Sequence, residues 1–250
     1  MMTIIRALGF ACLLMAAAPP ASFAAGLTIM AEDAAPPFSR ADGTGFANDV
    51  VRAAFKAAGI DVTFDVVPYA RCKKDTEDGK VAACFGMSWY SGVERSIVFS
   101  DQPVFLVHAD VFLLRGASGV SRAEDLTPGK VVGIVNEYEY PDVVYGLRRN
   151  GIVLQAANDD ITNLKLLARG RLDAAIVMTN DLVPQLQKAI QAGVAPQVAY
   201  AFRLGQEEAY VGFSRKNPQG ETARRSFNQG YRRILADGTV DALRRKWAGQ

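Results

Sequence analysis

Apolar residues in the first part of the chain follow two spacings in turn. Residues 27–31 alternate, which is typical of a half-buried strand, and residues 62–67 and 81–85 form further strand-like runs. Residues 46–58 carry apolar side chains three and four positions apart, which predicts an amphipathic helix, and a shorter helix is expected at 70–78. This order of elements predicts a parallel sheet covered by helices.

The same alternation restarts after a strand at 105–114. The expected strands are 131–135, 152–155, 172–178 and 198–202, and the expected helices are 141–150, 159–168 and 180–192. An apolar strand at 210–214 is expected to return to the first sheet, followed by helices at 221–237 and 240–248.

The repeat predicts an α/β fold with two lobes, each a parallel-type sheet flanked by helices, and two crossings between them. Residues 25–114 and 206–250 form the first predicted lobe, and residues 115–205 form the second. The stretch 115–119 (RGASG) is the expected crossing. A small ligand is expected between the lobes, where the carboxyl ends of the strands meet.

Residues 1–24 have the features of a cleaved signal peptide. Arg6 is their only charge, residues 7–18 are apolar, and Ser22-Phe23-Ala24 offers small residues where a signal peptidase cuts. The apolar run is too short to span a membrane. We therefore expect export and a soluble mature protein.

The charge distribution argues against nucleic acid as a partner. The net charge is +2, and basic residues are scattered. The densest group, Arg232 and Arg233 with residues 244–246, has helical spacing and favours a solvated helix face.

The few cysteines and histidines limit the possible chemistry. Cys72 and Cys84 are the two cysteines of the mature chain, and in an oxidising compartment a disulfide between them is the simplest interpretation. His108 is the only histidine and lies in an apolar strand. We therefore predict no metal site, no cofactor and no Cys–His or Ser–His nucleophile.

The segment after the strand at 81–85 is the first candidate binding loop. It places Trp89, Tyr90 and Arg95 near the carboxyl end of a strand, so that one loop offers apolar faces, a hydroxyl and a fixed positive charge. The alternative is that the aromatic residues pack and that Arg95 pairs with Glu94 or Asp101.

Five segments together resemble the periplasmic solute-binding proteins of family 3, the polar-amino-acid receptors of ABC transporters. PPFS at 36–39 with GFANDV at 45–50 is similar to the family's "PPF…GFDVDL", and GKVAA at 79–83 to "GK.DA". FSDQPVF at 99–105 is similar to "FSDPYY", and LARGRLDA at 167–174 to "L..GRVDA". ILADGTV at 234–240 with Lys246-Trp247 is similar to the closing "DG….KW".

The resemblance implies a clamp for an amino acid. Family members hold the carboxylate with an arginine after the third strand and the ammonium with an acid of the second lobe, often helped by an acid in the first loop. Here Glu32 stands for the first-loop acid, and Arg95 comes two residues after the arginine position, which is Val93. The second-lobe acid position is Met178, and Asp181 is the nearest substitute, although it also suits a helix start.

The segment 136–140 (NEYEY) replaces a loop of small residues in the family, and its acids and tyrosines favour a cationic or ring-bearing ligand. The predicted ligand-binding residues are Glu32, Phe38, Tyr69, Gly86, Met87, Ser88, Trp89, Arg95, Glu137, Tyr138, Tyr140 and Asp181.

The leading functional hypothesis is a monomeric periplasmic receptor that passes a small polar or cationic ligand to an inner-membrane permease. An alternative is an accessory or sensor protein that works with a partner such as a periplasmic dehydrogenase. The departures at Val93 and Met178 motivate it. A third is an enzyme similar to cyclohexadienyl dehydratase, with Glu137 or Glu139 at raised pKa as general acid.

Overall fold

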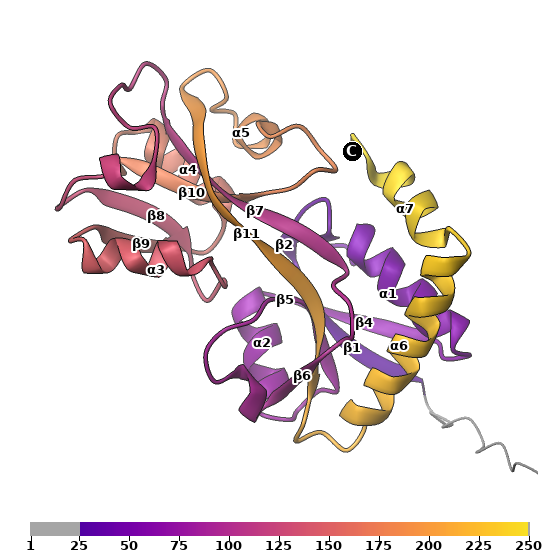
Figure 1. Ribbon diagram of the computed structural model, residues 1–250. Coiled ribbons are helices and arrows are strands. Elements are labelled where there is room, and N and C mark those ends of the chain that lie inside the picture. The colour runs from indigo at the N-terminus through magenta and orange to yellow at the C-terminus, as the bar shows by residue number, and fades with distance from the viewer. Residues whose placement is uncertain (1–25, 250) are drawn as a thin grey trace, which may run out of the picture.

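The structure is a computed structural model that describes residues 26–249. The predicted signal peptide, residues 1–24, lies outside the described residues. The strands are β1 (Leu27–Glu32), β2 (Ala34–Ala35), β3 (Ser39–Arg40), β4 (Val62–Val67), β5 (Ala83–Met87), β6 (Ile97–Phe99), β7 (Phe105–Leu114), β8 (Val131–Val135), β9 (Val153–Ala157), β10 (Ala174–Thr179) and β11 (Val198–Ser214). The helices are α1 (Phe46–Ala57), α2 (Tyr69–Glu77), α3 (Asp142–Arg149), α4 (Asp160–Ala168), α5 (Gln187–Gln191), α6 (Gly220–Ala236) and α7 (Thr239–Trp247) (Figure 1).

The predicted two-lobed α/β fold is confirmed. The sheet order is β4-β1-β5-β11-β7-β10-β8-β9, with β6 also paired to β11. The outer strands are parallel within each lobe: β1 pairs with β4 and β5, and β8 pairs with β9 and β10. Between them β11 and β7 run antiparallel from one lobe to the other (Figure 1). The first lobe consists of β1, β4–β6, α1, α2, α6 and α7, and the second consists of β8–β10 and α3–α5.

One long strand replaces the two strands expected at 198–202 and 210–214. β11 runs from Val198 to Ser214, pairing with β7 in its first part and with β5 and β6 in its second. The sequence between the two apolar runs is polar, so periodicity indicated a break there. Backbone pairing with β7 continues through it because ladder hydrogen bonds do not require apolar side chains.

The first lobe is held by an apolar layer between its sheet and helices α1 and α6. Phe46, Val50 and Phe55 are buried on the face of α1 that the spacing predicted. Phe55 contacts Phe227 of α6, with ring centroids 5.5 Å apart. The two helices cross closely because α6 has Gly230 at the contact: a Cβ there would lie 1.8 Å from the carbonyl oxygen of Ala54.

Two predictions for the second lobe are wrong. The helix expected at 180–192 is only α5, because the Asn180 side chain accepts a hydrogen bond from the Leu182 N–H (2.9 Å) in a local turn and Pro184 follows. The stretch 115–119 is not a crossing, because β7 before it already pairs with β10. β7 itself runs between the lobes, and the predicted lobe boundaries, 25–114 with 206–250 and 115–205, stay a prediction.

The predicted disulfide is present: Cys72 of α2 is bonded to Cys84 of β5. It fixes α2 to the sheet. His108 is buried, as expected of a structural histidine, and its Nε2 lies 3.0 Å from a carboxylate oxygen of Asp181. Within residues 26–249, no helix combines the length and apolarity that crossing a bilayer requires.

Candidate ligand-binding site

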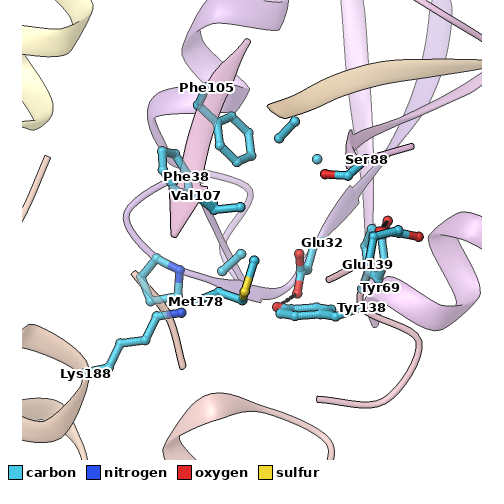
Figure 2. Close-up of a pocket in the computed structure, with 14 residues that line it drawn as sticks. Glu32, Phe38, Tyr69, Ser88, Phe105, Val107, Tyr138, Glu139, Met178 and Lys188 are labelled. Carbon is cyan, nitrogen blue, oxygen red and sulfur yellow. Dashed lines mark hydrogen bonds between the residues drawn. The ribbon is translucent and has the colours of Figure 1, made fainter. Parts of the chain in front are cut away.

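A small cavity lies between the lobes at the carboxyl ends of β1 and β5. Its lining residues are Glu32, Ala35, Pro36, Phe38, Tyr69, Gly86, Ser88, Phe105, Val107, Tyr138, Glu139, Met178, Lys188 and Ala209 (Figure 2). Its volume is about 50 Å³, room for only a few water molecules. A ligand of amino-acid size does not fit into this volume.

Glu32 ends β1 and carries the acid of the first lobe. Its side chain is buried and accepts one hydrogen bond, from the hydroxyl of Tyr138 (Figure 2). Burial raises the pKa of this carboxyl to about 7, although the Tyr138 hydroxyl and the more distant Lys188 lower it. Among the described residues no cation forms an ion pair with Glu32, so the site has an acid without a counter-charge.

The segment 136–140 of the second lobe reaches across the cavity to α2. The Tyr69 hydroxyl donates a hydrogen bond of 2.5 Å to Glu139, and Lys73 Nζ lies 2.9 Å from the other carboxylate oxygen. The rings of Tyr69 and Tyr138 meet edge to face at 5.3 Å. Burial raises the pKa of Glu139, and Lys73 and Tyr69 oppose that rise. The predicted raised pKa thus holds for Glu139.

Met178 and Lys188 form the second-lobe wall. Lys188 Nζ lies 2.5 Å from Asp160, a residue of the first turn of α4, and both side chains are almost fully buried. Asp160 also accepts a hydrogen bond from the Met178 N–H (3.4 Å). Burial raises the pKa of Asp160, whereas Lys188 lowers it. This wall therefore contains a closed ion pair.

The remaining walls are apolar. The rings of Phe38 and Phe105 stack with centroids 3.8 Å apart. Phe105 stands over Gly86, where a Cβ would lie 3.7 Å from the ring. Ser88 donates its hydroxyl hydrogen to the carbonyl oxygen of Glu208 (2.9 Å). The cavity therefore offers mostly aromatic and aliphatic surface and few polar groups, as small-molecule sites commonly do.

The structure brings together half of the twelve predicted binding residues: Glu32, Phe38, Tyr69, Gly86, Ser88 and Tyr138 line the cavity. Of the others, Met87 is buried in the core, and the Tyr140 hydroxyl accepts a hydrogen bond from the Val135 N–H. The side chains of Trp89, Arg95, Glu137 and Asp181 are exposed and do not line it. The turn that carries Trp89 begins later than expected, since β5 extends to Met87.

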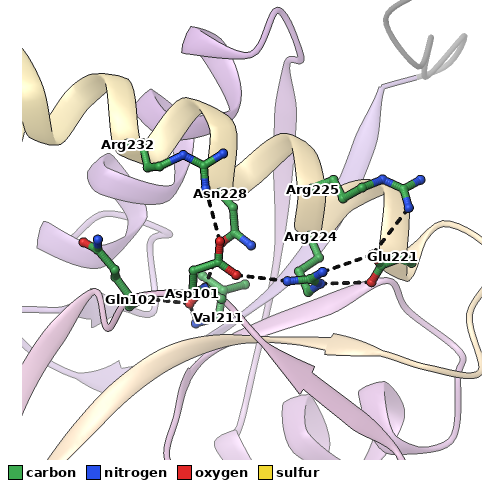
Figure 3. A network of polar contacts seen from close by, with 9 residues as sticks. Asp101, Gln102, Val211, Glu221, Arg224, Arg225, Asn228 and Arg232 are labelled. Carbon is green, nitrogen blue, oxygen red and sulfur yellow. Dashed lines mark hydrogen bonds and ion pairs between the residues drawn. The ribbon is translucent and has the colours of Figure 1, made fainter. Parts of the chain in front are cut away.

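Arg95 and Asp101, possible ion-pair partners in the sequence, are not joined. The carboxylate of Asp101 instead forms ion pairs with Arg224 (3.0 Å) and Arg232 (3.1 Å) of α6 (Figure 3). The Asp101 N–H also donates a hydrogen bond to the side-chain oxygen of Asn228 (3.0 Å), on the same helix. The Phe99-Ser100-Asp101 motif therefore fixes the loop before β7 to α6.

Sequence reasoning missed Lys188, Asp160 and Phe105 as parts of the site. Asp160 and Lys188 are 28 positions apart, and nothing in the local pattern links them. Met178 lines the cavity at the position where the resemblance places an acid. The resemblance therefore located this position, but it did not predict that an apolar side chain would line the cavity there.

Two lobes joined by paired strands, with a cavity where the strands end, define a bilobed ligand-binding fold. The sequence matches the model of the bacterial extracellular solute-binding proteins, family 3, over residues 27–250, and the chain belongs to that family. No protein with a curated description matches it in sequence.

Solved structures share the fold at low sequence identity. A histidine kinase sensor domain with similarity to periplasmic binding proteins has a TM-score of 0.75 at 22% identity, covering 90% of this chain and 96% of that one. An ancestral arginine-binding protein bound to arginine has a TM-score of 0.75 at 22% identity, covering 90% and 98%. The GluR0 ligand-binding core from Nostoc punctiforme in complex with L-glutamate has a TM-score of 0.72 at 21% identity, covering 88% and 98%.

Proposed function

We propose that this protein is a periplasmic receptor that captures a small cationic ligand between its lobes and delivers it, as a monomer, to an inner-membrane permease of the ABC type. The observation that carries the proposal is Glu32. It is a buried acid that forms no ion pair among the described residues, beside the rings of Tyr69 and Tyr138. An acid in this state gains most from a ligand cation, and aromatic rings add cation–π attraction.

Thermal unfolding of refolded, ligand-stripped protein tests the proposal. The panel contains basic amino acids, polyamines, other amines and, as a contrast, small organic acids. A cation at a hundred times its dissociation constant adds about 2.7 kcal/mol, which raises Tm by roughly 5–10 °C.

The matched variants are Glu32→Gln and Glu137→Gln. The first removes the buried charge, whereas the second removes an exposed acid of the loop that carries Tyr138. We expect the shift to disappear in Glu32→Gln and to persist in Glu137→Gln. A panel without any shift, or an equal shift in both variants, would contradict cation capture.

Side chains of the chain itself bridge the two lobes, and this favours a second candidate, a sensor or accessory protein. Tyr138 bonds to Glu32, and Tyr69 and Lys73 bond to Glu139, so the chain supplies bridges that a ligand would otherwise make. Such a protein would bind a periplasmic partner, for example a dehydrogenase, in the absence of any small molecule. Co-purification with one stoichiometric partner, together with a flat ligand panel, would support it.

We assign no catalytic role. A dehydratase would need a carboxylic acid that protonates a leaving group, and Glu139 is instead held by Lys73 and Tyr69. Turnover of a prephenate-like substrate is the observation that would restore the enzymatic alternative.

A further inference from the structure

The charges around the cavity form two closed pairs and one open acid. Glu139 is paired with Lys73, which also lies 4.0 Å from the exposed carboxylate of Glu137, and Lys188 is paired with Asp160. Glu32 is the remaining ionisable carboxyl among the described lining residues and has only the neutral Tyr138 as a hydrogen-bond partner there. With Glu32 ionised, the lining and its bonded partners sum to one negative charge.

A ligand carboxylate finds no free positive charge in the described part of this cavity. No arginine is among the lining residues within 26–249, and Arg95 is exposed outside it. Lys188 is the only cation of that lining, and Asp160 already neutralises it at 2.5 Å with both side chains almost fully buried. A carboxylate placed on Lys188 would come close to a second buried anion, and this costs more than the contact returns.

Lys188 can still bind a neutral oxygen. An ammonium group has three N–H donors, and among the described residues Asp160 is its single hydrogen-bond partner. Its Nζ lies at the cavity wall beside Met178, opposite the carboxyl of Glu32 (Figure 2). A hydroxyl or carbonyl oxygen would use a spare donor without adding charge beside Asp160.

From this charge balance we infer that the cleft selects a monocation that carries a neutral hydrogen-bond acceptor and no carboxylate, with the cation at Glu32 and the acceptor at Lys188. The inference rests on the proposed function, since it refines which cation is captured. It excludes free amino acids of zwitterionic form as preferred ligands.

Calorimetric titration at pH 7.5 with two matched ligand sets tests this selection. Each set has an amino acid, the corresponding amino alcohol and an amine that lacks both groups: phenylalanine, phenylalaninol and phenethylamine, then valine, valinol and isobutylamine. In at least one set we expect the amino alcohol to bind at least tenfold more tightly than the amino acid and several-fold more tightly than the plain amine.

The two failures differ. An amino acid that binds as tightly as its alcohol would overturn the inference and leave the receptor function intact. No binding by any alcohol or amine would overturn the inference, and the receptor function would then be decided by the thermal-unfolding panel with basic amino acids and polyamines.

Asp160→Asn gives an independent test, because it frees the charge of Lys188 with little change in volume. Phenylalanine should then gain at least tenfold in affinity, while phenylalaninol changes little. Asp173→Asn is the matched control: Asp173 pairs with Lys130 at 2.8 Å, away from the cavity lining, and its loss should leave both affinities unchanged. An Asp160→Asn variant that folds and still discriminates against phenylalanine would contradict the inference, and the wild-type series decides it if the variant does not fold.

Discussion

Glu32 and Asp110 are both buried acids on strands of one sheet, and their surroundings are opposite. Asp110 of β7 is fully buried and is bonded by Arg203 (2.8 Å), Thr179 (2.5 Å) and Gln185 (2.8 Å). Burial alone would raise the pKa of Asp110, but these bonds together lower it below its ordinary value. Glu32 has one hydrogen bond from a neutral hydroxyl, and its pKa rises to about 7.

Burial by itself therefore does not distinguish a structural acid from a functional one. Asp110 has its partners within the chain and connects β7, β10, β11 and the loop before α5, so its charge serves the fold. Glu32 faces a cavity and has no ion-pair partner among the described residues, so its charge weakens the fold and, under the proposed function, serves a ligand cation. Substitutions at and around the two acids can separate these roles.

The largest expected effect is the pH dependence of stability caused by Glu32. The carboxyl ionises near 4.5 in the unfolded chain and near 7 in the folded one, a span that corresponds to about 3 kcal/mol. Between these values the folded chain keeps a proton that the unfolded chain has released. Stability contributed by this group therefore falls as pH rises from 4.5 to 7 and is constant above.

Urea unfolding of the ligand-free wild type and of Glu32→Gln, at several pH values between 4 and 8, measures the effect. Glu139 and Asp160 are present in both proteins, so their titration cancels in the difference. Wild type should lose stability relative to the variant as pH rises. A difference that is flat or rises with pH would show that Glu32 has a counter-charge after all.

Removal of Arg203, the ion-pair partner of Asp110, should have the next largest effect on the free energy of unfolding. Arg203→Met leaves a buried carboxylate without its cation, and breaking a buried pair in this way costs about 3–5 kcal/mol. Arg203 is 41% exposed, so water can partly replace it, and we expect a loss of about 2 kcal/mol in unfolding free energy at pH 7. Arg225→Met, which removes an exposed ion pair with Glu221, should cost less than about 1 kcal/mol. Equal losses would remove the distinction between the two sites.

A smaller effect is expected from Tyr138→Phe. The Tyr138 hydroxyl lowers the pKa of Glu32, so its removal should raise the folded-state pKa, and with it the upper end of the pH-dependent loss, above 7, by roughly one pH unit for a hydrogen bond to a charged group. Tyr140→Phe removes a hydroxyl that contacts Val135 instead of Glu32, and the upper end of the loss should stay near pH 7. Titration of Glu32 followed by carboxyl-carbon NMR would give its folded-state pKa in both variants directly.

The sequence predicted the parts of this comparison that depend on local pattern. Glu32 follows an apolar strand, and Tyr69 and Tyr138 begin or follow regular elements, so spacing and resemblance located them. The pairs Asp110–Arg203 and Asp160–Lys188 join residues 93 and 28 positions apart, and tertiary packing alone creates them. The sequence therefore indicated which acids were present but not which had counter-charges.

Arg95 illustrates the same limit from the other side. Its position after β5 and the family resemblance made it the expected partner of a carboxylate. The short 3-10 turn Val93–Arg95 instead buries Val93 and leaves Arg95 in solvent. The family resemblance therefore identified the segment after β5, but the conformation of the turn Val93–Arg95 determined that Val93 and not Arg95 points inward.

The smallest effect is therefore expected for Arg95→Met, because Arg95 forms no ion pair with Glu32 or Asp110. Its side chain is exposed and does not line the cavity, so unfolding free energy should change by less than about 0.5 kcal/mol. Affinity for the tightest cation of the panel should change less than twofold, whereas Glu32→Gln should abolish binding. A tenfold loss in Arg95→Met would mean that the loop from Trp89 to Arg95 folds over the bound ligand, and Glu32 would then gain, on ligand binding, the kind of nearby arginine that Asp110 has permanently.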